Sequence, residues 1–144
     1  MKILVIGASG FVANSLLKRL SRLNGLEVLA VSRSIINVSK KFVGFKNISF
    51  LKFDFSKDNL SKLNFSPNII INLSSTQPSS DQKNWKNFVE GNIVTVNSLI
   101  DYAKEKNVDT IIHFSTSSVF SPSQSPINDQ TLPSPDNYYG LSKF

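Results

Sequence analysis

The stretch Met1-Lys-Ile-Leu-Val-Ile-Gly-Ala-Ser-Gly-Phe-Val-Ala13 decides the fold of this chain. Its apolar run from Ile3 to Ile6 ends at Gly7, and a second glycine follows at Gly10. From Phe11 onward apolar residues recur at helical spacing, which predicts a buried strand, a tight glycine turn and an amphipathic helix. Such a junction directs backbone N–H groups and a helix N-terminus at one point, where a phosphate binds favourably. An ordinary strand-to-helix turn is the alternative interpretation.

The composition is typical of one globular domain without disulfides. The chain has 144 residues, of which 40% are hydrophobic and 18% charged, enough for a buried core. It has no cysteine and one histidine, so we expect neither a disulfide nor a metal site. No apolar run approaches the roughly 20 residues that a membrane span needs, and the N-terminal run is too short for a signal peptide. We therefore expect a cytoplasmic protein with no membrane partner.

The net charge of +6 leaves three explanations open: nucleic acid, an anionic small ligand, or a solvated surface without a binding role. The lysines are scattered along the chain, and no arginine-rich block or nucleic-acid motif is present. We therefore expect no nucleic-acid partner.

Strands alternate with helices along the rest of the chain. Four more runs have the composition of strands: Leu26–Val31, Ile48–Phe53, Asn68–Leu73 and Thr110–Ser115. This alternation predicts an α/β fold with a Rossmann-like, doubly wound parallel sheet in the strand order 3-2-1-4-5. Ligands of such a sheet bind at the carboxyl ends of the first and fourth strands.

Helical periodicity predicts a short helix over Ser56–Leu63, with Ser56 as its N-cap, and a long helix from Trp85 to Ala103. Loops are expected over the polar stretches at 34–47 (with a short helix), 76–83 and 121–137.

Two motifs at opposite ends of the chain resemble one enzyme family. Gly7-x-x-Gly10-x-x-Ala13 and Tyr139-x-x-x-Lys143 resemble the extended short-chain dehydrogenase/reductases, NAD(P)-dependent epimerases, dehydratases and reductases that act mostly on nucleotide sugars. The resemblance covers the whole chain and corresponds to the first half of such an enzyme. It implies a truncated NAD(P)-binding Rossmann domain over 1–144, a sheet incomplete at its C-terminal side and no substrate-binding domain. It also implies a homodimer for the full-length protein, and we expect the 144 residues alone to be inactive.

The resemblance implies a cofactor site at the strand ends, made of Gly7, Ser9, Gly10, Phe11, Val12, Ser32, Arg33, Asp54, Phe55, Leu73, Ser74 and Ser75. NAD-preferring members have an acid where Ser32-Arg33 stands, whereas an arginine can pair with a 2′-phosphate and stack on adenine. We therefore expect NADP, with NAD as the alternative. Asp54 corresponds to the aspartate that accepts from the adenine amino group, although taken alone it could equally be a helix cap.

The resemblance places Thr116 at the catalytic Ser/Thr position and makes Tyr139 and Lys143 the catalytic pair. On a helix these two residues share one face, because they are four positions apart. A nearby ammonium favours the phenolate and lowers the pKa of the phenol from its usual value near 10. Tyr139 would then act as acid and base, Lys143 would set its pKa and bind the nicotinamide ribose, and Thr116 would orient the substrate.

The implied activity is an NAD(P)-dependent epimerase or reductase that acts on a nucleotide sugar by hydride transfer. Ser117 and Ser118 stand where nucleotide-sugar dehydratases have Asp-Glu, which argues against a dehydratase. The alternative is a non-catalytic NAD(P)-binding module or a truncated remnant of such an enzyme.

Three other positions receive structural interpretations. Asn92 resembles the asparagine that ties its helix to the fourth strand, and Thr95 stands where the family usually has a glycine. His113, the only histidine, is expected to be a packed or half-buried strand residue.

Overall fold

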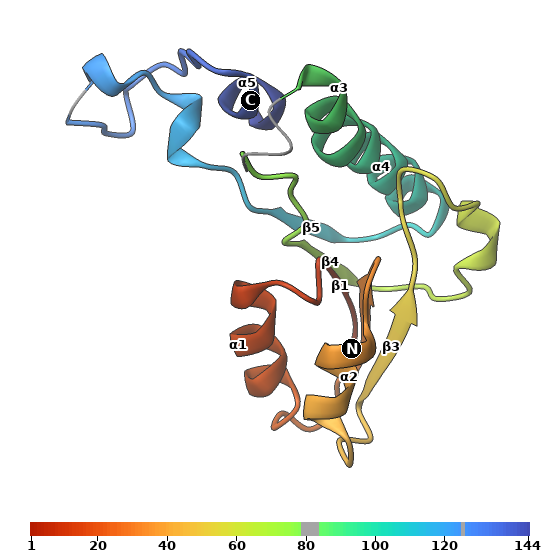
Figure 1. Ribbon diagram of the computed structural model, residues 1–144. Coiled ribbons are helices and arrows are strands. Elements are labelled where there is room, and N and C mark those ends of the chain that lie inside the picture. The colour runs from red at the N-terminus through yellow and green to blue at the C-terminus, as the bar shows by residue number, and fades with distance from the viewer. Residues whose placement is uncertain (79–83, 125) are drawn as a thin grey trace.

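The computed structural model describes residues 1–78, 84–124 and 126–144. Its centre is a five-stranded parallel sheet in the order β3-β2-β1-β4-β5 (Figure 1). The strands are β1 (Lys2–Ile6), β2 (Glu27–Ser32), β3 (Ile48–Lys52), β4 (Ile69–Asn72) and β5 (Thr110–His113). The α/β class, the Rossmann-like doubly wound sheet and the strand order predicted from the sequence are confirmed.

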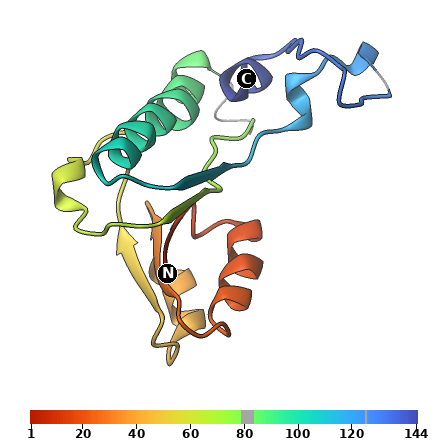
Figure 2. The same cartoon turned by 180° about the vertical axis from the view of Figure 1, so that it is seen from behind.

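Helices cover both faces of the sheet (Figures 1 and 2). The helices are α1 (Phe11–Leu20), α2 (Ile36–Ser39), α3 (Trp85–Phe88), α4 (Thr95–Glu105) and α5 (Tyr138–Lys143), with the π-helix η3 (Val89–Val94) between α3 and α4. Short 3-10 turns are η1 (Lys40–Phe42), η2 (Leu60–Lys62), η4 (Ser117–Val119) and η5 (Pro122–Gln124). Figures 1 and 2 show α1 and α2 on one side of the sheet, and α3 and α4 on the other.

Strand β1 contributes side chains to two separate hydrophobic cores, one on each face of the sheet, which explains its unbroken apolar run. Ile3 and Val5 pack with Leu17 of α1 in one core, whereas Leu4 and Ile6 pack with helix α4 in the other. All four side chains are at most 4% exposed. A one-residue shift of this strand would exchange the two sets, so the register of β1 is strongly specified.

The long helix predicted from Trp85 is interrupted by the π-helix η3. In this segment Thr95 donates from Oγ1 to the carbonyl oxygen of Glu90 at 3.2 Å, five residues earlier. A π-turn holds one more residue per turn than an α-helix and often occurs at functional sites. Apolar spacing alone does not reveal it, because both kinds of helix keep one buried face.

The short helix predicted over Ser56–Leu63 is wrong, since only the 3-10 turn η2 forms there. Ser56 is not an N-cap: its N–H and hydroxyl both donate to the Asp54 carboxylate, at 3.0 and 2.6 Å. Aspartate commonly forms such local turns, which compete with a helix.

The short helix expected within 34–47 is confirmed by α2 and η1. Residues 79–83 of the loop predicted over 76–83 lie outside the described residues, and the loop predicted over 121–137 contains η5 and is undescribed at residue 125.

Strand β5 forms one edge of the sheet, and its four residues are all exposed. The apolar residues Ile112 and Phe114 at this edge are 45% and 48% exposed. Within the described part of the chain, no helix has the length and apolar character needed to cross a membrane.

Candidate functional site

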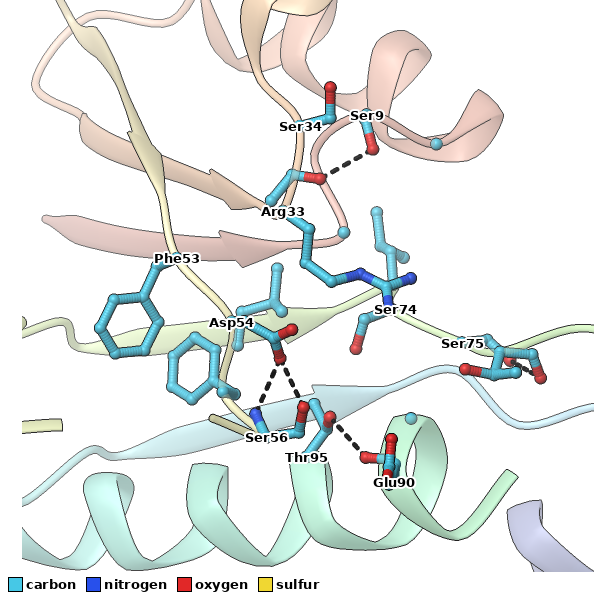
Figure 3. Close-up of a pocket in the computed structure, with 18 of the residues that line it drawn as sticks. Ser9, Arg33, Ser34, Phe53, Asp54, Ser56, Ser74, Ser75, Glu90 and Thr95 are labelled. Atoms are coloured by element: carbon cyan, nitrogen blue, oxygen red, sulfur yellow. Dashed lines mark hydrogen bonds between the residues drawn. The ribbon is translucent and has the colours of Figure 1, made fainter. Parts of the chain in front are cut away.

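A cavity of about 440 Å³ opens at the carboxyl ends of β1 to β4 (Figure 3). Its walls come from the four segments that follow these strands and from α3, η3 and α4. Ten of the twelve expected cofactor residues line it: Gly7, Ser9, Gly10, Ser32, Arg33, Asp54, Phe55, Leu73, Ser74 and Ser75. The other two, Phe11 and Val12, lie outside the lining, with 90% and 50% of their surface exposed.

The glycine turn after β1 presses directly against the chain that leaves β4. Gly7 has a φ of +82°, and a Cβ there would lie 2.7 Å from the nitrogen of Ser74. Only glycine combines this backbone conformation with so close an approach. Gly10 then caps α1 without a side-chain hydrogen bond, and the first turn of α1 has no acidic residue. The helix N-terminus therefore directs unneutralised partial positive charge to the cavity.

Beside the end of β2, a hydroxyl pair and an arginine line the cavity. The Oγ atoms of Ser9 and Ser32 lie 2.7 Å apart, and Ser32 is only 9% exposed. Figure 3 shows the Arg33 side chain extending across the cavity toward Ser74. The two hydroxyl groups can donate and accept hydrogen bonds, and the guanidinium can pair with an anion.

Asp54 lies at the wall of the cavity and also closes the turn that follows β3. Its carboxylate lines the cavity, and the same group caps the turn through Ser56. Its backbone N–H donates to Oδ2 of Asp58 at 2.6 Å, so the turn is closed from both ends. Phe53 and Phe55, on either side of it, are buried and hold the turn against the sheet.

The chain leaving β4 is fixed by two buried amides. Oδ1 of Asn72 accepts from the N–H and the hydroxyl of Ser74, at 3.0 and 2.6 Å. Asn92 pairs with the backbone of Thr76, accepting from its N–H at 2.7 Å and donating to its carbonyl at 3.2 Å. Gly91 permits this contact, because a Cβ there would lie 1.8 Å from Oγ1 of Thr76. Asn92 thus ties its helix to the segment after β4, as the resemblance implies.

The three expected catalytic residues lie outside the cavity lining: Thr116 is the N-cap of η4, and Tyr139 and Lys143 are on α5. Oγ1 of Thr116 caps η4 by accepting from the N–H of Ser118 at 3.2 Å. Helix α5 packs closely on this turn, since a Cβ on Gly140 would lie 1.9 Å from the Ser118 carbonyl oxygen. Tyr139 stacks against Phe88, with ring centroids 6.0 Å apart. The fold therefore brings the helix that carries Tyr139 and Lys143 against the segment that carries Thr116.

Lys143 is 9% exposed, and its Nζ lies 3.3 Å from Nε2 of His113. Burial lowers the pKa of Lys143 below its usual value. His113, expected to be packed or half-buried, is instead exposed at the edge of the sheet; partial burial of its ring against neighbouring groups still lowers its pKa, and the charge of Lys143 lowers it further. Both bases are therefore more easily uncharged than in water.

Sequence reasoning missed the cavity residues that come from the helical side and from the loops. They are Ile6, Ser34, Phe53, Ser56, Lys57, Thr76, Gln77, Asn87, Glu90, Gly91 and Thr95. Glu90, Gly91 and Thr95 lie on η3 and α4, where the sequence predicts one continuous helix, and Gly91 beside Asn92 marks a close approach. Among the described residues no cluster of potential ligands could hold a metal ion.

Comparison with known proteins agrees with this architecture. Residues 3–144 match the model of the NAD dependent epimerase/dehydratase family. The chain is 27% identical to an uncharacterized UDP-glucose epimerase, YtcB, of Bacillus subtilis, over all of this chain and 49% of that protein. It is 29% identical to protein CapI of Staphylococcus aureus, over 87% of this chain and 40% of that protein. The chain thus spans about half the length of the curated relatives that it matches, or less.

Among solved structures, UDP-glucuronic acid 4-epimerase from Bacillus cereus in complex with UDP-glucuronic acid and NAD is similar, with a TM-score of 0.85 and 27% identity. The superposition covers 99% of this chain and 49% of that one. Because the family model matches nearly the whole chain, the chain belongs to the NAD dependent epimerase/dehydratase family.

Proposed function

We propose that the full-length protein carrying this chain is an NAD(P)-dependent epimerase of a nucleotide sugar, with a reductase as the second candidate. The observation that carries the proposal is the cavity at the ends of β1 and β4, which combines the glycine turn with the uncapped start of α1. Family membership supports it, and so do relatives that are named as UDP-sugar epimerases.

The residues of the cavity fit a dinucleotide. The turn at Gly7, which lies against the chain after β4 because it has no Cβ, and the start of α1 suit a pyrophosphate. Asp54 would accept from the adenine amino group, while Ser9, Ser32 and Arg33 would hold the adenosine ribose and its substituent. The bound nicotinamide would take a hydride from the sugar and return it.

We propose NADP as the preferred cofactor and keep NAD as the alternative. The absence of an acid at Ser32-Arg33 supports NADP, because a carboxylate there would repel a 2′-phosphate. Against this, the Bacillus cereus epimerase was solved with NAD. The absence of an acid predicts tighter binding of NADP, whereas the Bacillus cereus epimerase predicts tighter binding of NAD. A competitive titration with the two cofactors decides between them.

The proposed catalytic roles follow the geometry of α5 and η4. Tyr139 would exchange a proton with the sugar hydroxyl, Lys143 would favour the phenolate when charged, and Thr116 would hydrogen-bond the reacting oxygen. Ser117 and Ser118 supply neither an acid nor a base beside Thr116, which supports an epimerase or reductase over a dehydratase.

The experiment is turnover of UDP-sugars by the full-length protein, followed by NMR of the sugar, with cofactor binding measured separately by fluorescence. We expect Tyr139→Phe to lower kcat by about 10²-fold or more while the cofactor still binds. Tyr138→Phe is the matched control, because Tyr138 is 56% exposed and packs on Trp85.

Full activity in Tyr139→Phe would contradict the proposed mechanism. Cofactor binding without turnover of any nucleotide sugar would favour the non-catalytic module instead. The expectation of a cytoplasmic homodimer is tested on the same full-length protein, by its mass in solution and by cell fractionation.

A further inference from the structure

A continuous set of hydrogen bonds joins the cofactor-facing strand end to the lysine of α5. Ser74 donates from its N–H to Oδ1 of Asn72 at 3.0 Å. Nδ2 of Asn72 lies 3.0 Å from Nδ1 of His113, and Nε2 of His113 lies 3.3 Å from Nζ of Lys143. Asn72 and His113 are also direct partners in the register of β4 and β5. Asn72 is completely buried and Lys143 is 9% exposed, whereas His113 between them is exposed at the edge of the sheet.

This arrangement selects one tautomer of the imidazole. The backbone N–H of Ser74 can only donate, so it holds the Asn72 oxygen and turns the amide nitrogen toward His113. An amide nitrogen also only donates, so Nδ1 of His113 must accept. In a neutral imidazole the proton is then on Nε2, and this N–H is directed at Lys143.

A charged Lys143 is therefore poorly matched to this contact, because an ammonium has three donors and no acceptor. Neither of the ion pairs among the described residues includes Lys143. The elements packed against α5 carry Lys86 on α3 and Glu90 on η3, and Tyr139 lies on α5 itself. Among the described residues, the hydrogen-bonding atom that contacts Nζ of Lys143 is Nε2 of His113.

We propose that His113 is a positioning residue: in the ligand-free protein its Nε2–H excludes the charged form of Lys143 from the contact between the two side chains. The ammonium of Lys143 is then stable only when it turns to a hydrogen-bond acceptor on a bound ligand. The proposal deepens the function proposed above and rests on it, because it takes the ligand to be the nicotinamide nucleotide, whose ribose hydroxyls would be the acceptors. Binding of the cofactor would then be coupled to proton uptake and to movement of Lys143.

The first test is the tautomer of His113 in the full-length protein without ligand. ¹⁵N NMR of labelled histidine separates the two ring nitrogens, and the signal is assigned by its loss in His113→Phe. We expect the Nε2–H tautomer at pH 8. The Nδ1–H tautomer would overturn the proposal, and this result requires no variant to fold beyond the one used for assignment.

The second test reverses the tautomer. In Asn72→Asp the carboxylate still accepts from Ser74, but it now also accepts from Nδ1–H of His113, which leaves the Nε2 lone pair facing Lys143. We expect the pKa of Lys143, followed by its ¹³Cε shift, to rise by about one unit or more. The matched control is the double variant Asn72→Asp with His113→Phe, which has the new charge but no imidazole.

An equal rise in the single and double variants would assign the effect to charge alone and overturn the role of His113. Both readings are made on ligand-free protein, so they are independent of the proposed function. If the tautomer is as expected and NADP(H) does not bind, the proposed function fails and the His113 contact stands.

The coupling of cofactor binding to proton uptake is measured by calorimetry of NADP binding in buffers of different ionisation enthalpy. We expect proton uptake in the wild type near pH 8 and less in Asn72→Asp.

Discussion

Asn92 donates a hydrogen bond from Nδ2 to Oγ of Ser142 at 2.8 Å, across 50 residues of sequence. The same buried side chain holds both backbone groups of Thr76, at the wall of the cavity. One amide therefore fixes both the cavity-lining chain after β4 and the helix that carries Tyr139 and Lys143. The two parts of the proposed site are therefore held in place by the same buried side chain, that of Asn92.

Asn92→Ala should lower the free energy of unfolding by about 1–3 kcal/mol, because it leaves the buried N–H of Thr76 without its partner. Urea unfolding of the full-length protein measures this loss. Asn97→Ala is the control, since Asn97 is exposed on the same helix, and it should change stability by no more than about 0.5 kcal/mol. Equal effects of the two variants would show that Asn92 does not support the site.

Gly7→Ala should abolish dinucleotide binding and destabilise the protein. Its Cβ would lie 2.7 Å from a backbone nitrogen, in a region where neither chain can yield without breaking β1 or β4. Gly44→Ala isolates the backbone strain, because Gly44 has a φ of +97° and its Cβ would meet nothing within 4 Å. We expect the control to lose about 1–3 kcal/mol of stability with binding intact. Retained binding in Gly7→Ala would contradict the close approach of β1 and β4.

The sheet and the glycine turn could be predicted from the sequence because each depends on local patterns. The run from Ile3 to Ile6 has to be buried on both faces, and only a parallel strand between two helical layers achieves this. The turn at Gly7 follows from the next residues alone. Ten of the twelve residues expected at the cofactor site line the cavity for the same reason, since they lie at or just after the ends of strands.

The remainder of the site depends on contacts between distant segments. His113 gains its partners only through the register that sets it beside Asn72 and through the docking of α5, which supplies Lys143. Neither relationship is visible in a single sequence. Likewise, Glu90 and Gly91 of the cavity lie on the π-helix η3, where the sequence predicts one continuous helix.

Arg33→Ala should weaken NADP binding by about 10- to 100-fold more than NAD binding, because a hydrogen bond to a charged group contributes about 1.5–3 kcal/mol. Arg19→Ala is the control: it removes the same charge from the last turn of α1, away from the cavity. Competitive fluorescence titration with both cofactors is the measurement. An equal loss for NAD and NADP would show that Arg33 does not read the 2′-phosphate, and would favour NAD as the cofactor.

The pKa of His113 is lowered in the folded protein from 6.5, first by burial and then by the charge of Lys143. The unfolded chain therefore binds a proton at a higher pH than the folded one, so stability is lost as the pH falls through 6.5 toward the folded pKa. Lys143 also has a pKa lowered by burial, so its contribution to stability is likewise lost as the pH falls, over a window that begins at 10.5. Carboxylates titrate near pH 4 and contribute below this range.

Urea unfolding at pH 8 and pH 5.5 should accordingly show a greater loss of stability in the wild type than in His113→Phe. The difference between the two proteins isolates this one imidazole from any other histidine of the full-length chain. Equal losses would mean that His113 accepts its proton as readily in the folded state as in water. The pairing of its two ring nitrogens with Asn72 and Lys143 would then not persist in solution, because that pairing opposes a second ring proton.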